Sequence, residues 1–187
     1  MARYLEVIRR DYERHGRSLT EPAFISLLIY RYGRWAWQRR NPVARWFANK
    51  VYGLLKLLIL NVTKVWIPPQ TVIGEDFHII HAYGSLVIHP DAIIGDRCGV
   101  MHNVTIGTNM RGGAPVIGND VFIGVNSAVL GSIRVGDRVR IGANTLVTTD
   151  VPSDSVVIGS PGQIRPRRSS GNPARLLGDA QVPQDGL

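Results

Sequence analysis

An aliphatic residue recurs at every sixth position over much of this chain, and this period restricts its fold more than any other feature. Ten positions between residues 88 and 147 keep the period, with one eleven-residue gap that marks an insertion of five residues. Glycine follows six of the ten, and the fifth position of each intact hexad is small or β-branched. The ten positions are Ile88, Ile94, Val100, Ile106, Ile117, Ile123, Val129, Val135, Ile141 and Val147.

A six-residue period suits neither an amphipathic helix nor a long strand. It suits a short strand followed by a tight turn, with glycine where the backbone must bend and no Cβ fits. Positions one and five of each hexad then point inward and stack on the next coil. The period predicts a parallel β-helix over residues 67–166. A sandwich of short strands is the alternative, but it would show spacings of eight to twelve residues and looser registration.

Residues 1–66 have a different composition, which predicts helices over residues 3–14, 20–38 and 42–64. Thr20 and Asn41 are the expected N-caps of the second and third helices, and each is soon followed by proline. Two successive prolines at 68 and 69 end the helical segment. The apolar stretch 54–60 is too short and too charged at its flanks for a membrane span of ~20 residues. Residues 167–187 are rich in Ser, Gly, Pro and Arg, and we expect a disordered tail.

Charge is divided unevenly along the chain. The net charge is +8, but residues 1–66 alone carry +9 and all four tryptophans, whereas residues 67–164 carry −3. The helical segment therefore has two compatible roles: capping one open end of the β-helix and joining protomers, which we favour, or peripheral contact with an anionic membrane. We do not expect nucleic-acid binding, because the charge lies on helices without a recognisable motif.

The single cysteine and the N-terminus restrict the cellular setting. Cys98 excludes a disulfide framework and a cysteine-based zinc cluster. The first ten residues are charged where a signal peptide would be apolar, so we expect a cytoplasmic protein, with membrane association as an option.

Five sequence motifs within residues 67–166 resemble the serine O-acetyltransferase-like branch of the hexapeptide-repeat, left-handed β-helix acyltransferases. The helical segment followed by Ile-Pro-Pro is more similar to the short branch, which includes colanic-acid-type exopolysaccharide acetyltransferases. This resemblance implies acetyl-CoA as donor, a hydroxyl acceptor, direct transfer in a ternary complex, and a homotrimer or dimer of trimers with active sites between subunits. The motifs are Ile67–Gly74, His81–Gly84, Val104–Gly107, Val116–Gly124 and Val157–Gly162.

Among the five histidines, His81 matches the general base of the family's His-Ala-Thr-Gly motif. An imidazole with a pKa near ~6.5 can deprotonate a hydroxyl at neutral pH, and a thioester needs no covalent intermediate. His102 stands where the family often has glutamine, and we expect it to orient the substrate or His81. His15 is expected to be solvated, and His78 and His89 to lie on the surface.

Three departures from the family bear on the acceptor. Trp66 lies fifteen residues before His81, where serine-specific members have an aspartate, and Ile80 replaces the acid next to the histidine. The inserted loop, residues 108–114, lacks the family's Arg-His-Pro. We expect this loop to cover the acceptor, with Asn109 and Arg111 as substrate-binding candidates. The favoured acceptor is a sugar in exopolysaccharide synthesis, and serine is the alternative.

The resemblance also implies where the donor, acetyl-CoA, would bind. Pantetheine would run along coil turns near Gly124, Val125 and Ala143. The nucleotide phosphates would bind arginines near the last coils, because a guanidinium can grip phosphate with two hydrogen bonds. The candidates are Arg138, Arg140 and Arg165.

No metal is expected. A zinc-dependent γ-type carbonic anhydrase shares the β-helix, but it needs two histidines five positions apart. From His78 onward the histidines are separated by 3, 8 and 13 positions.

Overall fold

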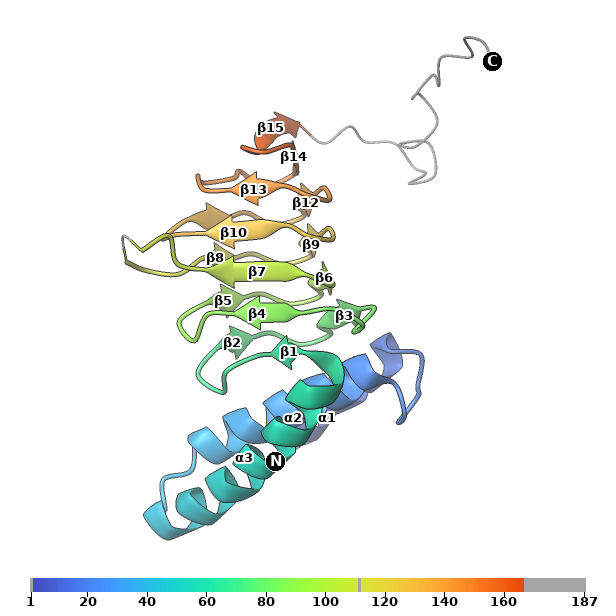
Figure 1. Ribbon diagram of the computed structural model, residues 1–187, viewed down its shortest axis with the longest axis vertical. Helices are drawn as coiled ribbons and strands as arrows, with labels where there is room; N and C mark the ends of the chain where they lie inside the picture. The colour runs from blue at the N-terminus through green and yellow to red at the C-terminus, as the bar shows by residue number, and fades with distance from the viewer. Residues whose placement is uncertain (1, 111, 167–187) are drawn as a thin grey trace.

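The computed structural model describes residues 2–110 and 112–166, which form three helices below a column of short strands (Figure 1). The helices are α1 (Ala2–Arg14), α2 (Pro22–Trp37) and α3 (Pro42–Thr63). Each lies within two residues of its predicted bounds. The Asn41 side chain caps α3 by accepting hydrogen bonds from the amides of Val43 and Ala44, at 2.9 and 3.1 Å. The Thr20 cap is wrong, because Glu21 holds that position without a side-chain cap bond.

The strands form three parallel sheets around a triangular coil, here called sheets A, B and C. Figure 1 shows β4, β5, β6 and β7 rising with a left-handed sense, which confirms the left-handed parallel β-helix. Sheet A holds β1 (Val65–Trp66), β4 (Leu86–Ile88), β7 (Val104–Gly107), β10 (Ala128–Leu130) and β13 (Leu146–Val147). Sheet B holds β2 (Val72–Ile73), β5 (Ile93–Ile94), β8 (Val116–Ile117) and β11 (Arg134–Val135). Sheet C holds β3 (His78–Ile80), β6 (Gly99–Met101), β9 (Phe122–Ile123), β12 (Arg140–Ile141), β14 (Ser155–Ile158) and β15 (Gln163–Pro166).

The last strand pair closes the top of the column. β15 returns antiparallel to β14, whereas every other pair in the three sheets is parallel. The described residues end at Pro166, so the predicted disordered tail of residues 167–187 lies outside them. None of the helices that the structure describes offers an apolar stretch long enough to cross a membrane.

The core consists of the hexad positions. All ten predicted aliphatic residues are at most 2% exposed, and they stack in register from rung to rung, as in Ile106 on Val129 on Val147. Full burial of such a side chain stabilises a fold by about 1.5–3 kcal/mol, so burial of the repeat is a main driving force for forming the column. The fifth positions, including Cys98 and Val139, are buried beside them.

The turn glycines were expected both to allow the backbone to bend and to leave room where no Cβ fits, and they have only the second role. A Cβ on Gly95 would lie 2.7 Å from the carbonyl oxygen of Gly118 in the next rung, so no side chain fits there. The backbone, however, adopts positive φ two residues later, at non-glycine residues such as Asp76 (58°), Arg97 (56°) and Asp120 (57°). Glycine therefore serves close rung packing, whereas asparagine, aspartate or arginine occupies the strained turn position.

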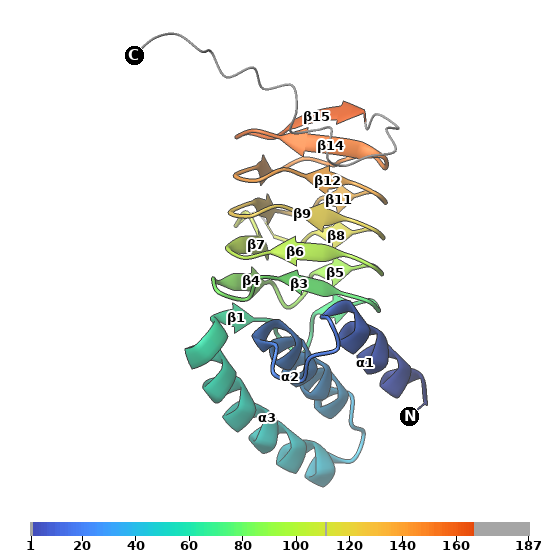
Figure 2. The ribbon, with the colours of Figure 1, turned by 90° about the vertical axis from the view of Figure 1, so that its right-hand side faces the viewer.

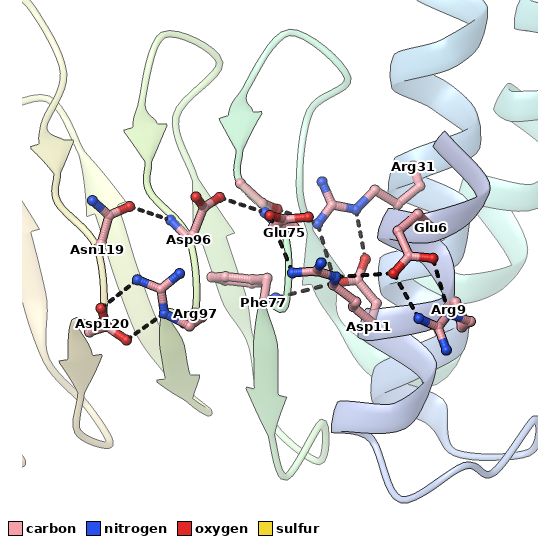
Figure 3. Close-up of polar contacts among 12 residues, drawn as sticks. Glu6, Arg9, Asp11, Arg31, Glu75, Phe77, Asp96, Arg97, Asn119 and Asp120 are labelled. Atoms are coloured by element: carbon pink, nitrogen blue, oxygen red, sulfur yellow. Dashed lines mark hydrogen bonds and ion pairs between the residues drawn. The ribbon is translucent and has the colours of Figure 1, made fainter. Parts of the chain in front are cut away.

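Side-chain ladders hold the corner between sheets B and C. The Asn119 amide oxygen accepts a hydrogen bond from the Asp96 backbone amide at 2.8 Å, and the Asp96 carboxylate accepts one from the Glu75 backbone amide at 2.9 Å. Figure 3 shows both contacts. Arg97 grips Asp120 through two bonds of 2.7 and 2.8 Å. This pairing lowers the pKa of the Asp120 carboxyl.

A buried ion pair joins the helices to the first rung (Figure 3). Arg31 of α2 donates to the Asp11 carboxylate of α1 at 2.8 Å, and the two side chains are 7% and 1% exposed. The same guanidinium donates to the carbonyl oxygens of Ile73 and Gly74, at 2.8 and 2.5 Å. Asp11 also accepts from the amide of Phe77 at 3.2 Å. The helical segment therefore caps the lower end of the β-helix, as predicted.

Replacing Asp11 with alanine should lower the free energy of unfolding by about 3 kcal/mol, because Arg31 would remain buried with its charge uncompensated. Urea denaturation followed by circular dichroism measures the change. Glu13→Ala on the same helix removes an exposed carboxylate and should cost less than about 0.5 kcal/mol. Equal losses in the two variants would contradict the structural role of the pair.

Candidate active site

The two predicted catalytic histidines lie in adjacent rungs at the corner between sheets C and A. His81 follows β3 and His102 follows β6, whose register pairs Ile80 with Met101. The ring centroids of the two histidines are 6.5 Å apart, with their planes at 62°. The His81 side chain is exposed and its backbone adopts φ 58°, so the imidazole projects outward from the corner.

Neither imidazole has an orienting partner among the described residues. Nδ1 of His102 is buried and forms no hydrogen bond there, and no hydrogen bond reaches the His81 ring. Trp66 lies in β1 opposite Val87 and supplies an indole where serine-specific members have a carboxylate. Among the described residues, nothing therefore fixes the tautomer of either imidazole.

The predicted pantetheine residues continue the same corner upward. Val125 and Ala143 occupy the position of His102 in the next two rungs. Backbone hydrogen bonds show this register: the Asn126 amide donates to the carbonyl oxygen of His102 at 3.3 Å, and the Asn144 amide donates to the carbonyl oxygen of Val125 at 2.8 Å. From His81 to Ala143 this column spans three rungs, roughly 14 Å at ~4.8 Å each. Gly124 beside it has no room for a side chain, since a Cβ would lie 2.7 Å from the amide nitrogen of Ala143.

Sequence reasoning missed an asparagine ladder that stiffens this corner. The Asn103 amide donates to Asn126 at 3.0 Å, and the Asn126 amide donates to Asn144 at 3.1 Å. Asn103 also accepts from the amide of Ser85 at 3.0 Å, which anchors the segment that follows His81. The recurrence of asparagine directly after His102, Val125 and Ala143 is the sequence pattern that could have revealed it.

Two of the three predicted phosphate-binding arginines share one surface. Arg140 pairs with Val156, which in turn pairs with Arg165, so both arginines lie exposed on the outer face of sheet C. Arg140 also lies 5.9 Å from the Phe122 ring centroid. Arg138 stands apart at the corner between sheets B and C, where its guanidinium grips Asp154 through bonds of 2.6 and 2.7 Å. This engagement makes Arg138 a poor phosphate ligand.

The inserted loop leaves the column at a different corner, between β7 of sheet A and β8 of sheet B. Asn109 is exposed and its amide packs on Gly131, while Met110 is 92% exposed. Arg111 lies outside the described residues. Within one protomer, the structure therefore does not bring Asn109 beside His81, because the four-residue strand β7, ~13 Å long, separates the two corners.

Comparison with known proteins agrees with this architecture. The family model described as "Bacterial transferase hexapeptide (six repeats)" matches residues 114–149. A serine acetyltransferase of Synechococcus elongatus is 38% identical over 149 residues, which cover 78% of this chain and 58% of that protein. A protein of Escherichia coli K12 named as a colanic acid biosynthesis acetyltransferase, WcaB, is 32% identical over 145 residues, 74% of this chain and 88% of that protein. The chain belongs to the hexapeptide-repeat acyltransferases.

Solved structures agree with this fold. The serine acetyltransferase of Brucella abortus in complex with coenzyme A aligns with a TM-score of 0.72 and 25% identity, covering 89% of this chain and 68% of that one. The serine acetyltransferase of Neisseria gonorrhoeae aligns with a TM-score of 0.73 and 23% identity, covering 97% and 72%. The chain spans a little over half the length of the Synechococcus serine acetyltransferase that it matches.

Cys98 lies in a setting that does not favour nucleophilic catalysis. The thiol is 2% exposed in the core, and burial raises its pKa to about 11. The thiolate that nucleophilic catalysis needs is therefore scarce at neutral pH. Among the residues that the structure describes, no three His, Cys, Asp or Glu side chains are grouped to hold a metal ion.

The expectation for His15 is wrong, and that for His78 is only partly right. His15 is 7% exposed, and its Nε2 accepts from the amide of Ile79 at 3.2 Å. His78 is half-buried, with its ring centroid 5.0 Å from that of His15. Burial lowers the pKa of His78 to about 4, and neighbouring positive charge acts in the same direction. The helix cap covers this edge of sheet C, which no local pattern in the sequence indicates.

Acid should therefore destabilise the protein through His78. The unfolded chain binds a proton near pH ~6.5, whereas the folded chain does so near pH 4, so stability is lost as the pH falls between these values. From pH 7 to pH 4.5, the wild type should lose roughly 1 kcal/mol more than His78→Gln, because solvent screens the half-exposed imidazole and reduces the effect of its lowered pKa. Urea denaturation at both pH values measures it. Identical losses in the wild type and His78→Gln would contradict this role of His78. The control is His89→Gln, a change outside the helix cap, which should lose as much stability as the wild type.

Proposed function

We propose that this chain is an acetyl-CoA-dependent O-acetyltransferase. The observation that carries the proposal is the corner column, which has His81 and His102 at its foot and Val125 and Ala143 above them. The likeness to a serine acetyltransferase solved with coenzyme A supports acetyl-CoA as donor. Pantetheine would follow the upper rungs toward His81, while Arg140 and Arg165 on the adjoining face of sheet C would hold the phosphates.

The His81 imidazole would act as general base. It would take the proton of the acceptor hydroxyl as that oxygen attacks the thioester carbonyl, and the tetrahedral intermediate would collapse with cleavage of the C–S bond. The same proton would pass from the imidazolium to the departing sulfur, which leaves the acetyl ester and free coenzyme A. His102, one rung above, would hold the acceptor or His81 in place.

We propose a homotrimer, or a dimer of trimers, as the active form. One protomer places Asn109 and His81 at opposite ends of sheet A, and it leaves the imidazole exposed without a partner among the described residues. Packing around a threefold axis parallel to the column would bring the loop of one protomer over the His81 corner of the next. Asn109 and Arg111 would then contact the acceptor. We propose a cytoplasmic location, with membrane association as an option, because acetyl-CoA would have to reach the column.

Serine is the acceptor that the comparisons support more strongly. The serine acetyltransferase of Synechococcus elongatus is 38% identical, against 32% for WcaB. A sugar remains the second candidate, because Trp66 replaces the acid expected of serine-specific members and because this chain covers 88% of WcaB. Both acceptors present a primary or secondary hydroxyl to the same base.

His81→Ala should lower kcat/KM by about 10²–10⁴, because the hydroxyl would lose its base in the transition state. Release of the coenzyme A thiol, followed with a chromogenic disulfide, measures the rate. The control is Arg97→Ala at the corner between sheets B and C, which should leave the rate within about twofold because its exposed side chain only pairs with Asp120. Wild-type rates in His81→Ala would remove this residue from the mechanism.

An acceptor panel should separate the two candidates. We expect thiol release with serine, and none above background with homoserine, nucleotide-linked sugars or lipid-linked sugars. Turnover with a sugar and not with serine would reverse the order of the two acceptors. An absence of turnover with every acceptor would contradict the proposed acetyl transfer.

A further inference from the structure

The outer face of α3 exposes an apolar surface that neither the β-helix nor the candidate site uses. The inner face packs on α2, where Tyr52 lies against Gly33, and buries Ala48 and Ile59. The opposite side carries large apolar side chains that are 49–74% exposed, and we call it the α3 outer face. Its members are Val43, Trp46, Phe47, Val51, Leu54, Leu57, Leu58 and Val62.

The charge around this face has one sign. From Pro22 to Gly74 the sequence holds eight Arg and Lys residues and not one Asp or Glu. Arg31 is committed to Asp11, and Arg34 donates to the carbonyl oxygens of Pro69 and Gln70, but the remaining six lie on or beside α2 and α3. Several are paired with tryptophan: Arg39 lies 3.8 Å above Trp35, and Lys50 lies 5.5 Å from the Trp46 ring centroid. The result is an apolar stripe bordered by cations and indoles.

The geometry leaves this face open. Figure 2 shows α3 on the outside of the helical cap, with α2 between it and α1, at the end of the column opposite β15. A flat partner could cover the length of the helix without contacting the candidate site. At 22 residues and ~1.5 Å per residue, the helix is about 33 Å long.

We propose that the α3 outer face lies flat on an anionic phospholipid surface. The leucines and Phe47 would enter the boundary between headgroups and acyl chains, Trp46 would remain at headgroup level, and the flanking Arg and Lys would bind lipid phosphates. A second copy of this face fits worse, because pairing it with itself would bring two sets of cations together with no carboxylate between Pro22 and Gly74 to offset them. Membrane binding of this kind is independent of which acceptor the enzyme uses.

The test is co-sedimentation of the full chain with vesicles made of equal parts phosphatidylglycerol and phosphatidylcholine. At about 50 mM salt most of the protein should pellet, and at about 500 mM salt the bound fraction should fall several-fold. The double variant Leu54→Glu/Leu58→Glu should bind at least about tenfold more weakly, because it places two carboxylates at the lipid boundary. Both leucines are about 60% exposed, so the variant should fold, which circular dichroism checks.

The matched control is Leu5→Glu/Leu19→Glu, which makes the same change at residues that are 59% and 70% exposed outside α3. It should pellet like the wild type. Equal pelleting with pure phosphatidylcholine, or equal binding by both double variants, would overturn the proposal. The proposal would also be overturned if the wild type did not pellet and light scattering showed a changed oligomeric state in Leu54→Glu/Leu58→Glu. The α3 outer face would then join copies of this chain.

Discussion

Stacking in register from one rung to the next is the constraint on which every other feature of this molecule depends. A rung of short strands cannot bury its own aliphatic side chains, and Ile106 becomes fully buried only because Val129 lies above it. The same register carries His102 over His81 and Val125 over His102. A slip of one residue would turn every inward side chain outward, so the core and the candidate active site are fixed by a single periodicity.

Two kinds of polar contact fix the alignment of the rungs and cover the lower end of the column. At the corners, ladders such as Asn103–Asn126–Asn144 align the rungs. At the lower end, the Asp11–Arg31 pair closes the exposed strand edge of the first rung by bonding to backbone groups of β2 and the turn after it. An open edge would invite pairing with another chain, so the helical cap protects the fold and leaves the α3 outer face for another contact.

Much of the fold followed from sequence because hexad periodicity is strict and local. The aliphatic positions, the three helices and the Asn41 cap were predicted, and so was the nearness of His102 to His81. Other features needed long-range contacts. His15 is buried because α1 docks on β3, sixty-four residues away at Ile79. Arg138 meets Asp154 across one coil, and positive φ falls on residues such as Asp120 instead of glycine.

The sequence by itself determined the triangular coil, its inward residues and the histidine that resembles a general base, because these depend on spacing along a regular repeat. Only the tertiary structure decided which surfaces meet. It separates Asn109 from His81 within a protomer, joins Val125 and Ala143 to the histidine corner, and turns the apolar side of α3 outward. These outcomes depend on where the five-residue insertion leaves the coil and on how the helices dock, and neither is encoded in the period of six.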